Sequence, residues 1–204
     1  MSAPIVPKKS LGQNFLISDR VGRRIVKLAD IHPVDFVVEI GPGTGFLTEG
    51  LLARGVYVVA VDQSAVMLDA LRAKFPETTR LDCRVGEAEQ LPLESGSVDY
   101  CLANMFLHHV EHPPAAIREM VRVLRPGGSV VISDLDSHDF SFLREEHHDR
   151  WMGFGRAQVR DWFVEAGLTD VQVAGSGEDC CAVSEAGVEA SVSIFVASGR
   201  RFET

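Results

Sequence analysis

The chain has 204 residues, of which 46% are hydrophobic and 24% are charged, and its formal net charge is −9. This length and composition predict one globular domain over residues 1–204 with a full core. The excess of acidic residues argues against a broad nucleic-acid-binding face. The sequence contains no apolar run of about 18 residues, so we expect no membrane-spanning helix. Four cysteines do not make a disulfide scaffold, so we expect a cytoplasmic protein. The sequence does not decide between a monomer and a dimer.

Strands and helices alternate along the chain after an N-terminal arm at residues 1–17. Apolar residues with helical spacing follow at 18–31. We expect strands at 36–40, 56–61, 80–85, 97–103, 128–134, 169–174 and 191–198. Helices should occupy 44–54, 64–74, 114–124, 139–151 and 155–166, and the longest loop 175–190. Repeated strand–helix units predict an α/β fold, in which a doubly wound, mostly parallel sheet carries helices on both faces.

The most informative segment joins the strand at 36–40 to the helix behind it. Gly41, Gly43 and Gly45 stand at alternate positions, and residues without Cβ allow a sharp turn and the close approach of a ligand. Asp62 follows about 20 residues after the first glycine, where a doubly wound fold places the carboxylate that binds a ribose. A nucleoside cofactor is therefore predicted to bind between residues 39 and 62.

The spacing of these glycines differs from the dinucleotide fingerprint, because the third glycine comes one residue early. Phe46 stands where a dinucleotide site has glycine. Glu39 would repel a pyrophosphate but suits the ammonium group of a methionine moiety. The pattern E-x-G-x-G-x-G with Asp62 resembles the class I S-adenosylmethionine (SAM) methyltransferases. A dinucleotide site, or a turn that only connects strand to helix, is the alternative.

Further segments resemble the same family in the same order. Glu87-Ala88 is similar to the pair that holds the adenine amino group, and Asn104-Met-Phe-Leu-His-His resembles a segment of the ubiquinone-biosynthesis-like branch. The resemblance implies a Rossmann-like, seven-stranded sheet with a final antiparallel strand, with SAM as methyl donor and S-adenosylhomocysteine as product. The cofactor contacts that it implies are Gln13, Phe15, Glu39, Gly41, Gly43, Gly45, Asp62, Gln63, Glu87, Ala88 and Asn104.

The arm at Lys8-Lys-Ser-Leu-Gly-Gln-Asn-Phe-Leu16 resembles that of the ribosomal-RNA adenine dimethyltransferases. In that family the arm closes over SAM, which implies the same role for Gln13 and Phe15. The likeness fails at Asn104-Met-Phe-Leu, where the RNA enzymes carry Asn-Leu-Pro and an aromatic ring that stacks on the base. A small-molecule acceptor, methylated by in-line displacement, is therefore the preferred expectation, and an RNA adenine N6-methyltransferase is the alternative.

His108 and His109, just after the fourth predicted strand, are the candidate catalytic residues. One of them could accept a proton or line the pocket, although packing at a strand–helix corner is the favoured interpretation. His138, His147 and His148 match no metal-binding spacing, so no metal is expected.

Three C-terminal segments are Ser133-Asp-Leu-Asp-Ser-His-Asp139, Leu143-Arg-Glu-Glu-His-His-Asp-Arg-Trp-Met-Gly-Phe154 and Cys180-Cys181. Together they resemble small methyltransferases related to the arsenite methyltransferases. Cys180 and Cys181 lie in the predicted loop, and soft vicinal thiols can bind a metalloid. Two further alternatives therefore stay open: an arsenite or metalloid methyltransferase, and a non-catalytic protein that binds SAM or a metalloid.

Overall fold

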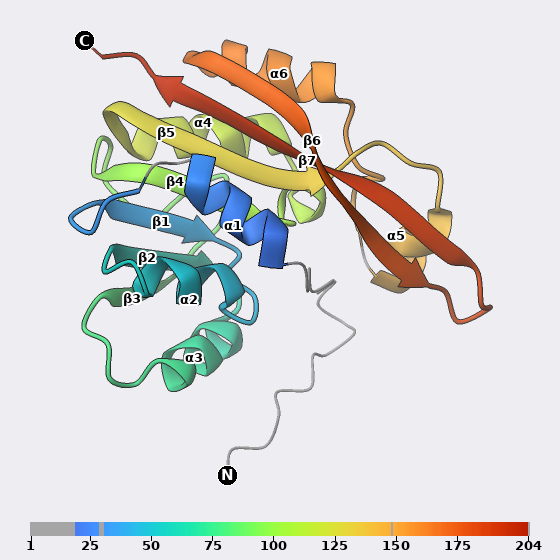
Figure 1. Ribbon diagram of the computed structural model, residues 1–204, viewed down its shortest axis with the longest axis horizontal. Coiled ribbons are helices and arrows are strands. Elements are labelled where there is room, and N and C mark those ends of the chain that lie inside the picture. The colour runs from blue at the N-terminus through green and yellow to red at the C-terminus, as the bar shows by residue number, and fades with distance from the viewer. Residues whose placement is uncertain (1–18, 29–30, 148, 204) are drawn as a thin grey trace.

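The computed structural model describes residues 19–28, 31–147 and 149–203. The arm at residues 1–17, with Gln13 and Phe15, lies outside these residues, as does His148. In the described part of the chain, seven strands form one sheet in the order β3-β2-β1-β4-β5-β7-β6 (Figure 1). No helix in the described ranges is long and apolar enough to cross a membrane.

The elements follow the predicted alternation. The strands are β1 (Phe36–Ile40), β2 (Tyr57–Asp62), β3 (Leu81–Val85), β4 (Val98–Asn104), β5 (Leu124–Leu135), β6 (Leu168–Val183) and β7 (Glu189–Arg201). The helices are α1 (Asp19–Leu28), α2 (Phe46–Leu52), α3 (Ala65–Lys74), α4 (Pro113–Val123), α5 (Ser141–His147) and α6 (Arg156–Glu165). A short 3-10 helix, Leu107–His109, lies between β4 and α4.

The pairing of the strands confirms the predicted fold class. Strand β1 pairs in parallel with β2 and β4, and β3 and β5 extend the parallel sheet on either side. Strand β7 runs antiparallel to both of its neighbours, β5 and β6. Since β1, β2 and β4 are parallel, their carboxyl ends meet at one edge of the sheet, which is where ligands bind in doubly wound folds.

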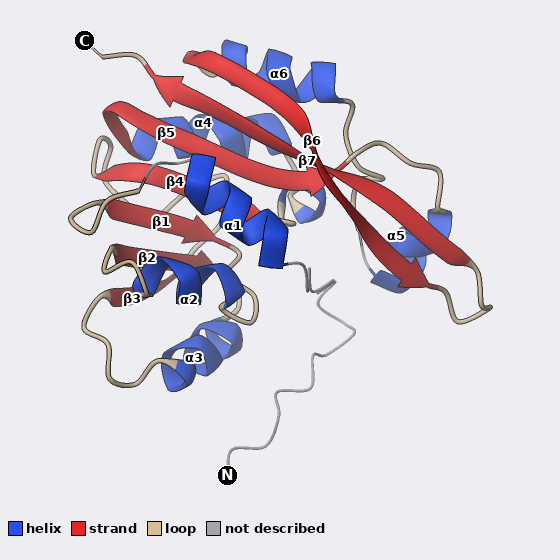
Figure 2. Ribbon diagram, viewed as in Figure 1, coloured by secondary structure: helices blue, strands red, loops and turns tan. Residues whose placement is uncertain are grey.

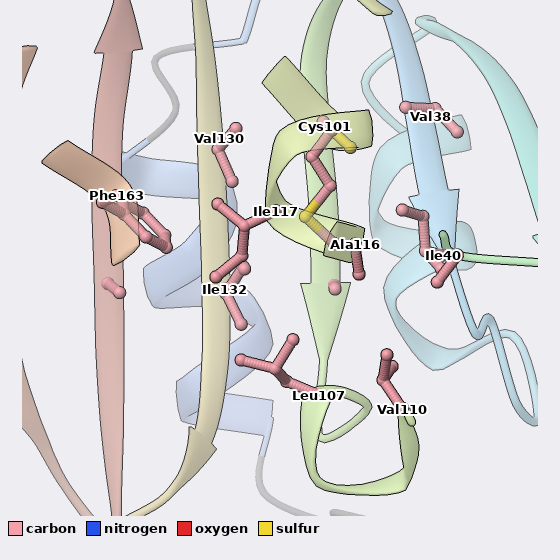
Figure 3. Close-up of a cluster of buried hydrophobic side chains, with 14 of the residues drawn as sticks. Val38, Ile40, Cys101, Leu107, Val110, Ala116, Ile117, Val130, Ile132 and Phe163 are labelled. Carbon is pink, nitrogen blue, oxygen red and sulfur yellow. The ribbon is translucent and has the colours of Figure 1, made fainter. Parts of the chain in front are cut away.

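Helices cover both faces of the sheet (Figure 2). Successive side chains of a strand point to opposite faces, and β4 shows this with the buried pair Cys101 and Leu102. Leu102 belongs to the cluster that receives α1 and α2, whereas Cys101 belongs to the cluster that receives Ile117 of α4 and Phe163 of α6 (Figure 3). The central strands are therefore apolar on both sides, as a covered parallel sheet requires.

The prediction of a loop at 175–190 is wrong, because strands occupy most of these residues. Strand β6 continues to Val183 and pairs with β7 as a long hairpin, which projects beside α5 (Figure 1). The register shifts between Gly175 and Asp179, and Gly177 has φ 81°. The glycines thus form an irregularity within the strand and do not end it.

The helix predicted at 139–151 is too long. Helix α5 ends at His147, and Asp149 is turned inward with only 2% of its surface exposed. The backbone N–H groups of Arg150 and Trp151 both donate to the carbonyl of His108, at 3.0 and 3.1 Å. The helix therefore stops short of Asp149, because backbone bonds to a distant segment outweigh the local helical preference.

Gly153 and Gly187 provide a matched test of this inward turn. Both have positive φ, 66° and 80°, which costs an alanine about 1–2 kcal/mol. A Cβ at Gly153 would also overlap the carbonyl of Asp136, whereas a Cβ at Gly187 would meet open space. Gly153→Ala should therefore lower the melting temperature clearly more than Gly187→Ala, by about 2–4 °C for each additional kcal/mol. Equal losses in thermal unfolding would contradict this account of the turn.

Candidate active site

A cavity of about 240 Å³ opens at the carboxyl ends of β1, β2 and β4. The structure brings most of the predicted site residues together at this cavity. Those that line it are Glu39, Gly41, Gly43, Asp62, Gln63, Ala88, Asn104 and His109. Gly45, Glu87 and His108 are not among its lining residues.

The three glycines of the turn all have left-handed φ angles, 65° at Gly41, 53° at Gly43 and 80° at Gly45. Side chains rarely adopt this conformation. A Cβ at Gly41 would overlap the ring of Phe106, and one at Gly45 would overlap Leu71. At Gly43 a Cβ would meet nothing within 4 Å, because this glycine borders the cavity. Gly41 and Gly45 thus keep the turn closed against its neighbours, and Gly43 exposes backbone to a ligand.

Glu39 is a buried acid at the floor of the cavity, with 2% of its surface exposed. The hydroxyl of Thr48 donates a hydrogen bond of 2.6 Å to its carboxylate. Burial disfavours the charged form more than Thr48 and Lys74 favour it, so the pKa of Glu39 rises to about 8. A cation in the cavity would reverse this balance by stabilising the carboxylate.

Two polar side chains mark the ends of the neighbouring strands. Asp62 ends β2 and accepts a hydrogen bond of 2.8 Å from the backbone N–H of Ser64. Burial raises its pKa, and the bond from Ser64 opposes that rise. Asn104 ends β4, and its side-chain oxygen accepts a hydrogen bond of 2.6 Å from the hydroxyl of Ser133. These bonds hold both side chains at the cavity wall.

The two candidate histidines face different environments. The side chain of His109 is 24% exposed and lines the cavity, whereas that of His108 is fully buried. His108 Nδ1 lies 2.7 Å from a carboxylate oxygen of Asp134. Burial lowers the pKa of His108, but the charges of Asp134 and Asp149 outweigh it, so the net pKa is raised. Of the two, His109 is the histidine that a bound acceptor could reach.

Sequence reasoning missed two features of the cavity. Met105, directly after β4, is a non-glycine residue with φ 51°, a strained conformation that costs of order 1–3 kcal/mol. It directs the chain so that Phe106 packs against Gly41 and both line the cavity. Asp149, which lies behind the cavity beside His109, was also missed, since it arrives from a segment about 40 residues beyond the histidines.

The structure does not bring the two vicinal thiols to one site. Cys180 and Cys181 are consecutive residues of β6, so their side chains point to opposite faces of the strand. Cys180 is half-buried and Cys181 is exposed. Burial, and secondarily the charge of Asp149, raises the pKa of Cys180 to about 11. This geometry does not favour a metalloid shared by the pair.

The fold and the lining residues agree with the comparison to known families. Residues 38–132, from β1 into β5, match the model of a methyltransferase domain. Over these residues the chain resembles the class I SAM-dependent methyltransferases. The cofactor of this family is SAM, and the cavity of the methyltransferase domain lies at the sheet edge where its glycine turn and Asp62 meet.

Relatives share the methyltransferase domain over part of their length. An uncharacterised methyltransferase of Mycobacterium tuberculosis is 50% identical over 92 residues, which are 45% of this chain and 36% of that protein. A ribosomal RNA small subunit methyltransferase A of Dehalococcoides mccartyi is 50% identical over 68 residues, 33% of this chain and 23% of that protein. The matched segments therefore span about a third or less of these curated relatives.

Solved structures show the same architecture. Phosphoethanolamine N-methyltransferase 2 of Haemonchus contortus, in complex with SAM, superposes with a TM-score of 0.76 at 16% identity. The match covers 94% of this chain and 55% of that chain. At this identity the likeness concerns the fold alone.

The raised pKa of Glu39 predicts an unusual dependence of stability on pH. Between its ordinary pKa of 4.5 and about 8, the folded state holds a proton that the unfolded state releases, so stability should fall as pH rises through this window. Glu39→Gln removes this ionisation and can still accept from Thr48. The variant should therefore have a flatter pH profile and a higher melting temperature than wild type at pH 8–9.

A matched control for this prediction is Glu165→Gln, which makes the same change at an exposed acid at the end of α6, outside the cavity. Its pH profile should follow that of wild type. A Glu39→Gln profile as steep as that of wild type would show that Glu39 ionises normally.

Proposed function

We propose that this protein transfers the methyl group of SAM to a small-molecule acceptor by in-line displacement. The observation that carries the proposal is the cavity at the carboxyl edge of the sheet, where Glu39, the glycine turn and Asp62 converge. An acid, a glycine-rich turn and a second acid match the successive ammonium, methionine and ribose parts of SAM.

Each lining residue then has a chemical partner in the cofactor. Glu39 binds the ammonium group, whose charge compensates the burial of the carboxylate. Gly41 and Gly43 let the methionine part lie against the backbone, and Asp62 accepts hydrogen bonds from the ribose hydroxyls. Ala88 lies against the adenine, with Gln63 and Asn104 at the walls. Glu87 is exposed and would contact the adenine amino group only by turning its side chain inward.

The acceptor would lie beside the segment that follows β4, where Phe106 and His109 line the cavity. The methyl group of a sulfonium is already activated, so the protein mainly has to align the nucleophile and exclude water. Orientation of this kind contributes on the order of 7–11 kcal/mol in well-aligned reactions. A general base is needed only where the nucleophile carries a proton, and His109 is the residue placed for that role.

Ribosomal RNA is the second candidate acceptor, because a segment of the chain is 50% identical to a ribosomal RNA methyltransferase over 68 residues. Two features favour the small molecule. The net charge is −9, whereas RNA binding requires clustered cations. The residues after Asn104 are Met105 and Phe106, without the proline of the RNA enzymes.

We also propose that residues 1–204 act as one domain and that the protein works in the cytoplasm. All four cysteines are free thiols. Free thiols are typical of a reducing compartment.

The cofactor site is tested by calorimetric titration with SAM and S-adenosylhomocysteine. Asp62→Ala removes the ribose contact and Gly43→Val blocks the backbone that borders the cavity, so each should weaken binding at least about tenfold, the equivalent of roughly 1.4 kcal/mol. Asp82→Ala is the control, since this acid is exposed on β3 and outside the cavity. Unchanged affinity in both site variants would place the cofactor elsewhere.

The class of acceptor is tested with radiolabelled SAM and two acceptor pools, structured ribosomal RNA and the small-molecule fraction of a cell extract. We expect label in the small-molecule fraction and no association with RNA at low salt. Salt-dependent RNA binding with label in the RNA would instead establish the second candidate.

A further inference from the structure

A buried cluster of two histidines and two carboxylates lies directly behind the cavity wall. His108, Asp134 and Asp149 are buried, at 0–2% exposure, and His109 connects them to the cavity. Asp134 is the second-last residue of β5, the two histidines follow β4, and Asp149 follows α5. Three segments far apart in sequence thus place nitrogen and oxygen ligands in one apolar surrounding.

The orientation of His108 is fixed by Asp134. One oxygen of Asp134 lies 2.7 Å from His108 Nδ1, and the other accepts from the backbone N–H of His108 at 3.2 Å. With its proton held on Nδ1 by the carboxylate, the ring presents the lone pair of Nε2 on its other side. Metal-binding histidines are oriented by a carboxylate in this way.

The Nε2 atom of His108 is buried and has no hydrogen-bond partner among the described residues. It lies 3.8 Å from Oδ1 of Asp149, beyond hydrogen-bond length. A buried polar nitrogen without a partner is costly, and a group that binds between Nε2 and the carboxylate would remove that cost.

His109 completes the arrangement. Its Nδ1 lies 3.8 Å from the same Oδ1 of Asp149, and the three ligand atoms all lie within 4.8 Å of one another. Ligand atoms around a tetrahedral zinc ion stand roughly 3.4 Å apart, given bonds of about 2.0–2.1 Å. The two edges to Asp149 therefore need to shorten by a few tenths of an ångström, and the edge between the two imidazole nitrogens by at most about 1.4 Å, to enclose an ion.

We propose that His108 Nε2, His109 Nδ1 and the carboxylate of Asp149 bind one divalent transition-metal ion. Two imidazoles and one carboxylate suit zinc, iron(II) or cobalt(II), whereas magnesium and calcium prefer oxygen ligands. Asp134 is the second-shell carboxylate. The remaining coordination positions are open to water or to a heteroatom of a ligand, because His109 borders the cavity.

The backbone holds the carboxylate ligand in place. Arg150 and Trp151 donate to the carbonyl of His108, and Asp149 donates to the carbonyl of Leu143 at 3.4 Å. The loop that carries Asp149 is thus tied to the residue that supplies the first imidazole. The site is preorganised whether or not the chain transfers methyl groups, so this inference does not depend on the proposed function. A metal ion on Nδ1 would, however, replace the general-base role given to His109 above.

The test uses the full chain after removal of metals with a chelator, titrated with Zn²⁺ by calorimetry and with Co²⁺ by visible absorption. Wild type should bind one equivalent, with Co²⁺ bands of nitrogen and oxygen ligands and no thiolate charge-transfer band. His109→Gln and Asp149→Asn should each weaken binding at least about 100-fold, and Asp134→Asn about 10–100-fold, the range for second-shell residues.

Two controls separate this site from other metal ligands. His112→Gln changes a neighbouring histidine whose side chain is 72% exposed, and Cys180→Ser/Cys181→Ser removes the thiols of β6. Both should bind as wild type does. If Asp149→Asn does not fold, His109→Gln carries the test, since its ring is partly exposed.

Three results would overturn the proposal. The first is that wild type does not bind Zn²⁺ or Co²⁺ stoichiometrically. The second is that the affinity for these ions is unchanged in His109→Gln and Asp149→Asn, and the third is that the double serine variant no longer binds them. SAM binding is measured on the same samples. Failure of the cofactor site with intact metal binding would reject the proposed function and leave this inference standing.

Discussion

The left-handed turn between β1 and α2 is the constraint on which the rest of the site depends. Gly41, Gly43 and Gly45 reverse the chain within a few residues, so that α2 begins directly behind the end of β1. Side chains at Gly41 or Gly45 would collide with Phe106 or Leu71. The turn therefore joins two walls of the cavity, because Gly41, which bends the backbone, also receives the ring of Phe106.

The carboxyl edge of the sheet contains buried charge on both sides of the cavity. On one side Glu39 carries a desolvated carboxyl beneath the glycine turn. On the other, His108 and the acids Asp134 and Asp149 share an interior without solvent. Burying ionisable groups costs free energy unless a partner compensates. Both positions lie where a ligand can supply that partner, a cation of the cofactor at Glu39 and a metal ion at the histidines, so the cost is concentrated where binding can offset it.

The C-terminal third of the chain adapts the common fold. The long β6–β7 hairpin inserts β7 beside β5, and the connection through α5 carries Asp149 back to the histidines. This return also explains why Trp151 donates from its ring to the carbonyl of Val110, at the cavity rim, while Phe154 is buried in the core. The wall of the cavity at His109 and Val110 thus depends on a segment distant from the methyltransferase motifs.

The sequence alone determined the parts of this protein that depend on local patterns. Alternating apolar strands and helices predicted the sheet, and the glycines with Glu39 and Asp62 predicted the cofactor edge, because turn geometry and strand ends follow from near neighbours. The tertiary structure decided what depends on distant segments. The tertiary structure extends β6 through most of the glycine-rich stretch at 175–190, which local propensity assigns to a loop. Pairing with β7 makes this possible, because the pair accommodates an irregularity at the glycines. The tertiary structure separated Cys180 from Cys181 through the alternation of that strand. It also buried Asp149 against His108 and His109, since the hydrogen bonds that draw it inward come from a carbonyl about 40 residues earlier, and no local pattern contains them.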